Sequence, residues 1–397
     1  MSREEIRTKF RSIEYEGRFV FGGDFALLKD FLSKKDSTLW VPLQLLDALL
    51  RGFGQATCAN NPISGLLVVI ALGVASPGLL VLSIATGLLG LLLSILIREP
   101  SESVENGLTV FNPLLVGALA YAFVPKMYGP FDAFSLLLLF FSTIFSVYLT
   151  RSAGSGKLPS LTFPYVVVEL MLLFILKEHN GGFQYIETSM QNITINNGTR
   201  SVTMDDTSTI VGKGDAVSPD WGMIFRGVVT SASQVYGVDD VALGSVVYLA
   251  LIIYSPITTA FSFAGALIGS LLGLELDISY EIIYSGVWGF NGLLTGAALG
   301  GNFLIINKHA SIATVVAIAF TTILQYIIYI ILNKYQLPYL SMPFVISTWL
   351  FLCLAKSRED TFIFSSIQSY PEKQKYEFLH RQRMGRMREV DDESETF

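Results

Sequence analysis

Two halves of this chain carry the same residue pattern 179 positions apart, and no other feature limits its possible folds as strongly. Gln55 pairs with Gln234 in this register. The longer aligned strings are FNPLLVGA (111–118) with FNGLLTGA (290–297), and LPSLTFP (158–164) with LPYLSMP (337–343). Chance similarity between leucine-rich segments would match leucines, whereas this match includes Gln, Pro, Asn and Gly without a gap. The sequence therefore predicts two copies of one structural unit.

Both copies consist of long apolar runs separated by short polar pieces. The chain of 397 residues is 51% hydrophobic and only 15% charged, whereas soluble domains carry about 25% charged residues. Runs of about 20 apolar residues are long enough to cross the hydrocarbon core of a bilayer as helices. The sequence therefore predicts an all-α polytopic membrane protein embedded in a lipid bilayer.

The number of membrane crossings in each copy decides how the two copies are oriented. Each copy holds six apolar pieces, and an odd number of spans per copy would invert the second copy relative to the first. The Phe-Asn-x-Leu-Leu-x-Gly-Ala piece is short and holds an Asn in apolar surroundings, which is typical of a re-entrant helix facing a cavity. We therefore predict two inverted repeats of five transmembrane helices plus one re-entrant helix each, about ten spans.

Polar stretches divide the chain into five parts. They are a cytoplasmic N-terminal segment (1–39), transmembrane repeat A (40–177), an extracellular glycosylated loop (178–220), transmembrane repeat B (221–355) and a cytoplasmic C-terminal tail (356–397). The loop holds glycosylation sequons at Asn192 and Asn197, which are used only outside the cytoplasm. Five spans in repeat A place this loop opposite to the basic N-terminal segment. We expect a multi-pass plasma-membrane protein with both termini cytoplasmic and a solvated tail.

Polar residues that recur inside the apolar runs are the candidate functional residues. They form the pairs Gln55 with Gln234, Thr162 with Ser341, and Asn112 with Asn291. Each hydroxyl lies between two prolines, and proline frees a backbone carbonyl four residues earlier. Hydrogen bonding between helices is the alternative role for such residues. Because substrate sites form where repeats meet, we predict that the Gln and hydroxyl pairs line a pore and that the Asn pair braces the re-entrant helices.

Apolar residues on the predicted re-entrant helices are a second candidate group. Phe111 and Leu115 are four residues apart, as are Phe290 and Leu294, so each pair shares one helix face. Ordinary packing accounts for such a pair in most helices. On a re-entrant helix the same face is placed to wall a slot.

Several function classes lack the residues they need. No His pair lies inside an apolar run, which argues against a proton relay. The chain shows no nucleophile–base arrangement, metal-ligand cluster, cofactor motif or nucleic-acid footprint, so we expect no enzyme activity, metal, cofactor or nucleic acid. Glu169 is an unduplicated carboxyl group inside an apolar run, since its repeat mate is Thr348. A contact between helices explains it, and a coupling role would instead indicate an active transporter.

The repeated motifs resemble the urea transporter family, in its eukaryotic branch. The strings that carry the resemblance are RGFGQATCANNPISG (51–65), NGLTVFNPLLVGALA (106–120), LPSLTFP (158–164), YSGVWGFNGLLTGAALGG (284–301) and LPYLSMPFVISTW (337–349). The resemblance implies ten spans in two inverted halves and a homotrimer with one pore per subunit. It also implies site roles: Gln55 and Gln234 at the ends of a filter, Phe111, Leu115, Phe290 and Leu294 as walls of a flat slot, and Thr162 and Ser341 near its middle.

This chain departs from the family pattern at three places. Cys58 stands where an aromatic is usual, Ser341 where Thr is expected, and Asp239-Asp240-Val241 where an Asn-Pro pair is usual. The first two departures put the outer shape of the filter and its fine selectivity in doubt.

The implied function is passive, facilitated diffusion of urea, and its physical chemistry suits the candidate residues. Urea is planar, neutral and rich in N–H donors, so a slot with apolar faces and oxygen-lined edges replaces its hydration shell. Leaving such polar groups unpaired in hydrocarbon costs about 2–7 kcal/mol. The alternatives are a channel for ammonia or other small neutral solutes, an ion-coupled transporter that uses Glu169, and a membrane enzyme or scaffold.

Overall fold

The protein is helical throughout the part that the structure describes. The computed structural model describes residues 22–35, 37–154, 158–195, 218–358, 361–364 and 369–395, and in 180–195 and 385–395 it describes the backbone alone. Outside the helices, these residues form one isolated β-bridge, between Leu304 and Phe364. Four of the described helices are long and apolar enough to cross a membrane: Pro77–Leu96, Ala133–Gly154, Pro256–Glu275 and Lys308–Asn333. The prediction of an all-α membrane protein is confirmed.

The helices recur in pairs with the spacing of the sequence repeat. The pairs are α3 (Val41–Gln55) with α10 (Trp221–Gln234), α4 (Pro62–Ala75) with α11 (Val241–Tyr254), α5 (Pro77–Leu96) with α12 (Pro256–Glu275), α6 (Ser101–Glu105) with α13 (Tyr280–Tyr284), α7 (Phe111–Met127) with α14 (Phe290–Ala297), α8 (Ala133–Gly154) with α15 (Lys308–Asn333), and α9 (Phe163–Ile195) with α16 (Met342–Lys356). The unpaired elements are α2 (Ala26–Ser33), η1 (Thr38–Trp40), η2 (Ala298–Asn302) and α17 (Pro371–Glu395). Members of five pairs begin at positions 179 residues apart, so matching sequence has produced matching local structure.

Two helix starts show how the chain defines these boundaries. Asn61 caps α4, because its side chain accepts hydrogen bonds from the backbone N–H groups of Ile63 and Ser64. Asp240 caps α11 in the same way, accepting from the N–H of Leu243 at 2.6 Å. A capping side chain satisfies backbone donors that have no partner inside the helix. The departure of the sequence at Asp240 therefore keeps the capping function of Asn61.

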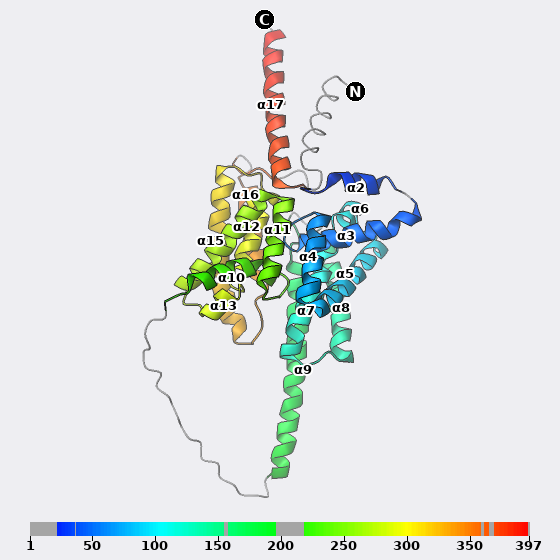
Figure 1. Cartoon of the computed structure of the whole chain (residues 1–397), viewed down its shortest axis with the longest axis vertical. Helices are drawn as coiled ribbons and strands as arrows, with labels where there is room; N and C mark the ends of the chain where they lie inside the picture. Colours follow the sequence, from blue (N-terminus) through cyan, green and yellow to red (C-terminus); the bar gives the residue numbers. More distant parts are fainter. Residues whose placement is uncertain are drawn as a thin grey trace.

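The two halves lie side by side, with α4 and α11 packed between them (Figure 1). Hydrogen bonds cross this junction from both directions. Ser64 donates to the carbonyl of Ala250 at 2.6 Å, and the Tyr236 hydroxyl donates to the carbonyl of Phe53 at 2.7 Å. All four residues are buried or lie in the core. The halves thus share one interior.

The paired elements differ in length at one important place. The sequence predicts a short helix in both copies, but α7 has 17 residues and only α14, with 8, is short. After α14 the chain continues through η2, where Gly301 has a φ of 127°. Its repeat mate is Ala122, a residue that favours helix and disfavours positive φ. The glycine therefore explains why the second copy breaks where the first continues.

The last helix of repeat A extends beyond the predicted end of that repeat. α9 continues to Ile195, into the stretch that the sequence assigns to a loop, and leaves the body at the end opposite to α2 and α17 (Figure 1). Of the two sequons, the side chain of Asn192 and the whole of Asn197 lie outside the described residues.

Part of the C-terminal tail packs on the body, which differs from the solvated tail that the sequence predicts. The N–H of Ile305 donates to the carbonyl of Ile363 at 2.9 Å, and Ser369 donates to the carboxylate of Asp24 at 2.8 Å. Glu372 accepts from the Ser255 hydroxyl at 2.9 Å and so covers the start of α12. These contacts arise from residues far apart in sequence, which a pattern of charges along the tail does not reveal.

The close approach of α3 and α4 requires glycine at position 65. A Cβ at Gly65 would overlap the carbonyl oxygen of Leu50, a backbone atom. We expect Gly65→Ala to lower the yield of folded protein severely, because the two helices would have to separate. Gly154→Ala is the matched control, since nothing lies within 4 Å of its Cβ. Size-exclusion profiles and thermal unfolding in detergent measure both, and equal profiles for the two variants would contradict the expectation.

Candidate functional site

The site is built where the two copies meet at the starts of α9 and α16. Thr162 directly precedes α9 and Ser341 directly precedes α16, and their hydroxyl oxygens are 2.7 Å apart. Both side chains are buried. The residues before them, Leu161 and Leu340, have matching left-handed φ angles of 48° and 49°. The repeat register thus brings two equivalent hydroxyls into direct contact at the junction of the halves.

Asn112 and Asn291 hold these bends in place. Asn112 donates from Nδ2 to the carbonyl of Leu161, and Asn291 donates to the carbonyl of Leu340, both at 3.1 Å. The Oδ1 atom of each Asn faces a backbone N–H of the following helix at 3.4 Å. These bonds satisfy backbone groups that would otherwise be unpaired at membrane depth. The two asparagines therefore brace the bends before α9 and α16, whereas the prediction that they brace re-entrant helices stays a prediction.

The two glutamines occupy equivalent positions at the ends of α3 and α10. Gln55 donates from Nε2 to the carbonyl of Asn106 at 3.1 Å, and Gln234 donates to the carbonyl of Ser285 at 2.8 Å. Each amide is therefore oriented by a backbone acceptor in the loop before α7 or before α14. Asn106 was not predicted as a site residue, although it directly precedes the repeated glycine Gly107.

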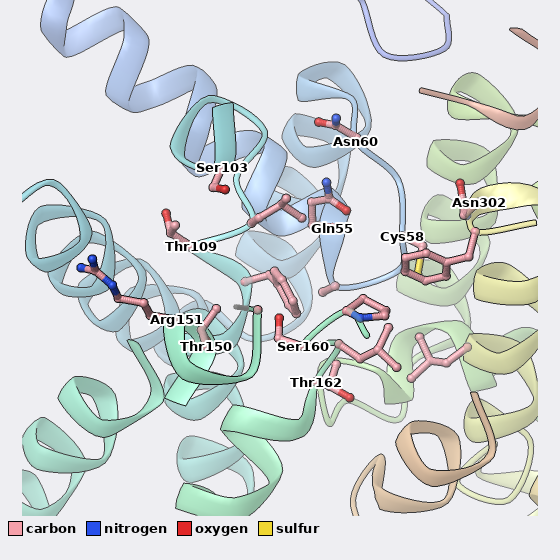
Figure 2. A pocket seen from close by; sticks show the side chains of 18 of the residues that line it. Gln55, Cys58, Asn60, Ser103, Thr109, Thr150, Arg151, Ser160, Thr162 and Asn302 are labelled. Atoms are coloured by element: carbon pink, nitrogen blue, oxygen red, sulfur yellow. The ribbon is translucent and has the colours of Figure 1, made fainter. Parts of the chain in front are cut away.

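A cavity of about 620 Å³ contains part of the predicted site. Four predicted residues line it, namely Gln55, Phe111, Thr162 and Leu294. The other four, Leu115, Gln234, Phe290 and Ser341, do not line this cavity. Figure 2 shows Gln55 and Thr162 at different levels of it. The cavity thus extends from Gln55 to Thr162. Ser341 does not line it, but its hydroxyl contacts that of Thr162.

Other residues that line the cavity were not predicted from the sequence. They include Asn60, Thr109, Thr150, Ser160, Asn302, Phe364 and Ser369. Asn60, Thr109 and Ser160 lie within the strings that carry the family resemblance, so the sequence could have indicated them as cavity-lining residues. Phe364 and Ser369 reach the cavity only through the packing of the C-terminal segment. Tyr165 was also missed; its hydroxyl accepts a hydrogen bond from Ser341 at 3.1 Å.

The lining of the cavity carries no net charge. Its charged lining residues are Glu99 and Arg151, whose Oε1 and Nε atoms are 3.5 Å apart. Within the described part of the chain, no group of three or more His, Cys, Asp or Glu residues is placed to hold a metal ion. Cys58, one of the departures from the family pattern, also lines this cavity. A neutral polar solute fits such surroundings better than an ion does.

Glu169 lies apart from this lining. Its side chain is fully buried in α9, and among the described residues neither carboxyl oxygen has a hydrogen-bond partner. Tyr165, which contacts Ser341, precedes it by one helical turn. Glu169 is thus linked to the hydroxyl pair only through Tyr165, one helical turn away.

Comparisons with known proteins agree on one family. A family model described as urea transporter matches residues 46–356. A protein named urea transporter 1 from the goat, Capra hircus, is 26% identical over 364 residues, which cover 90% of this chain and 88% of that protein. Urea transporter 1 from the mouse, Mus musculus, is 26% identical over 339 residues, covering 84% of this chain and 82% of that protein.

Proposed function

The chain belongs to the urea transporter family, and from that premise we propose that it conducts urea passively through a pore between its two repeats. Its family is one of transport proteins, and the relatives' names state urea as what they transport. The observation that carries the channel mechanism is the contact between Thr162 and Ser341 where the two copies meet. Hydroxyl oxygens at that position accept N–H donors from urea without holding a charge.

We propose distinct roles for the eight candidate residues. Gln55 and Gln234 present amide groups at the two ends of the pore, and Thr162 and Ser341 present hydroxyls at its middle. The apolar faces of Phe111, Leu115, Phe290 and Leu294 exclude ions, because an ion loses its hydration there without replacement. Weak hydrogen bonds in series lower the barrier for urea without trapping it, as rapid conduction requires.

We further propose an inverted arrangement of the two repeats with about ten spans. The seven helix pairs support the repeat, and the position of the far end of α9 opposite to α2 and α17 supports the placement of the central loop on the other side of the membrane (Figure 1). In this topology both termini are cytoplasmic in the plasma membrane, residues 178–220 are extracellular, and Asn192 and Asn197 carry glycans. A homotrimer is the assembly that the family resemblance suggests.

Urea efflux from proteoliposomes tests the mechanism. Purified full-length protein is reconstituted without any ion or pH gradient, and efflux of urea is followed by light scattering. A passive pore predicts fast, weakly saturating flux under these conditions. Flux that starts only when a proton or sodium gradient is applied would overturn the channel and favour ion coupling through Glu169.

Glu169→Gln separates the two mechanisms further. The substitution preserves shape and removes the ionisable group. Gradient-independent flux that persists in Glu169→Gln agrees with the passive pore, whereas a coupled transporter would lose its response to the gradient.

A further inference from the structure

The two repeats differ sharply beside the phenylalanines of the proposed slot. In repeat B an aromatic cluster of Trp288, Tyr329 and Tyr339 fills this region. The ring centroids of Trp288 and Tyr329 are 5.9 Å apart, and those of Trp288 and Tyr339 are 6.3 Å apart. Gln325 donates to the carbonyl of Trp288 at 3.0 Å and ties the cluster to α15. Repeat B is therefore closed by tight packing at this position.

Small hydroxyl residues replace the whole cluster in repeat A. The repeat mates of Trp288, Tyr329 and Tyr339 are Thr109, Thr150 and Ser160, as read from the 179-residue register. All three line the cavity of about 620 Å³. Figure 2 shows Thr109, Thr150 and Arg151 on one side of the cavity, Cys58 and Asn302 on the other, and Gln55 between the two groups. We call the part lined by Thr109, Thr150, Ser160 and Arg151 the side chamber.

The helix beside the side chamber has no room for a large ring at position 109. In repeat B, a Cβ at Gly273 would overlap the Trp288 indole, so glycine makes room for that ring. The mate of Gly273 is Ser94, which is fully buried and donates to the carbonyl of Gly90 at 2.8 Å. A tryptophan at position 109 would meet the side chain of Ser94. Repeat A thus lacks both the aromatic rings and the glycine in α5 that would make room for them.

The phenylalanines show the same asymmetry. Phe290 stacks on Tyr339 with centroids 6.1 Å apart and planes at 14°. Phe111 has Ser160 at the matching position, and both residues line the cavity. One wall of the proposed slot is therefore supported by a ring, and the other borders an open chamber.

Hydrogen-bonding capacity remains unused in the side chamber. Thr109 is 5% exposed, and its hydroxyl has no partner among the described residues. Thr150 donates to the carbonyl of Ser146 at 2.7 Å and accepts from Asn112 at 3.3 Å. Buried hydroxyls are normally paired, so the Thr109 hydroxyl indicates a place for a polar molecule. The Glu99–Arg151 pair beside it has no net charge, so the chamber favours a neutral solute over an ion.

We propose that the side chamber binds a second, off-path molecule of a neutral solute with the size and donor-rich edges of urea. The inference rests on the proposed function in one respect, namely that urea reaches the cavity from the Gln55 side. The Thr109 hydroxyl accepts or donates at one edge of the solute, and the remaining lone pair of Thr150 accepts at another. Asn112 connects this position to the central bend, because it bonds both Thr150 and Leu161.

Selenourea is a suitable probe, because its selenium gives an anomalous signal in crystals of the full chain. We expect one peak in the slot near Thr162 and a separate peak between Thr109 and Thr150. If crystals grown with increasing selenourea concentrations show a slot peak and never a chamber peak, the side-chamber proposal alone is overturned. A chamber peak without a slot peak would uphold it and contradict the proposed pore.

Two variants test which residues form the chamber. Ser160→Tyr introduces the repeat-B residue and should abolish the chamber peak while the slot peak stays. Thr109→Val preserves shape and should lower chamber occupancy, with about tenfold weaker binding for a lost hydrogen bond. The proposal fails if Thr109→Val binds selenourea in the chamber as well as the unaltered chain does, and this test stands even where Ser160→Tyr does not fold.

Discussion

Removing the two central hydroxyls together, in Thr162→Val with Ser341→Ala, should reduce urea flux by about 10- to 100-fold. In the structure these hydroxyls are 2.7 Å apart and buried where the halves meet. A urea N–H that passes this point without an acceptor loses about 1–3 kcal/mol of hydrogen bonding, and each 1.4 kcal/mol changes a rate about tenfold. Neither substitution adds volume beyond the original side chain, so a drop in flux reports lost hydrogen bonding rather than a blocked path.

The measurement is urea efflux from proteoliposomes at equal protein content, with two controls. Ser341→Thr keeps the hydroxyl and makes the pair identical, so its flux should stay within about twofold of the unaltered chain by this argument. Thr314→Val removes a buried hydroxyl of α15 that donates to the carbonyl of Ala310, one turn back on its own helix. It should leave the flux unchanged. Full flux in the double variant would show that urea crosses the junction by another route.

Much of the arrangement around this pair follows from the repeat register. Because Thr162 and Ser341 are repeat mates, any packing that relates the halves by a two-fold axis places them at equal distances from it. Their direct contact then requires only that the axis pass between them. The glutamine and asparagine pairs obey the same reasoning, and their backbone partners are also repeat mates. A single-chain pattern therefore predicted which residues behave alike.

Features that break the repeat were harder to predict. Ser369 and Phe364 line the cavity because the C-terminal segment folds back on the body, and no periodicity encodes that contact. The short α14 depends on the positive φ of Gly301, one glycine among 34 in the sequence. The side chamber depends on substitutions at three separate mates. Such differences become interpretable only when the space that each side chain fills is known.

The buried ion pair of α3 provides the largest expected effect on stability. Arg51 is fully buried and donates from Nε to Asp47 at 2.8 Å. Its Nη1 atom donates to the carbonyl of Asp24 at 2.8 Å and to Asn60 at 3.2 Å. One guanidinium thus joins α3, the N-terminal segment and the loop before α4. Because Asn60 also lines the cavity, this cluster supports the entrance on the Gln55 side.

Arg51→Met should destabilise the protein by about 3–5 kcal/mol, because it leaves the Asp47 carboxylate buried without its partner. The double variant Asp47→Leu with Arg51→Met removes both charges and should recover a large part of this loss. In repeat B the mate of Arg51 is the uncharged Thr230, so that half folds without a buried guanidinium at this position. Thermal unfolding of the full chain in one detergent compares the variants.

Arg226→Met is the matched control for the loss of an arginine. Arg226 is the repeat mate of Asp47 and pairs with Asp239 at 2.8 Å, with side-chain exposures of 32% and 46%. Solvent screens such a pair, so the pair itself should contribute less than about 1 kcal/mol. Arg226 also donates from Nη1 to the carbonyl of Tyr284 at 2.6 Å, and the loss of that bond adds about 1 kcal/mol, so Arg226→Met should still destabilise the protein less than Arg51→Met. A double variant as unstable as Arg51→Met alone would mean that the guanidinium acts through Asp24 and Asn60 rather than through the charge of Asp47. The ordering of the three melting temperatures therefore distinguishes a buried charge that must be neutralised from a hydrogen-bonding hub that holds the cavity entrance together.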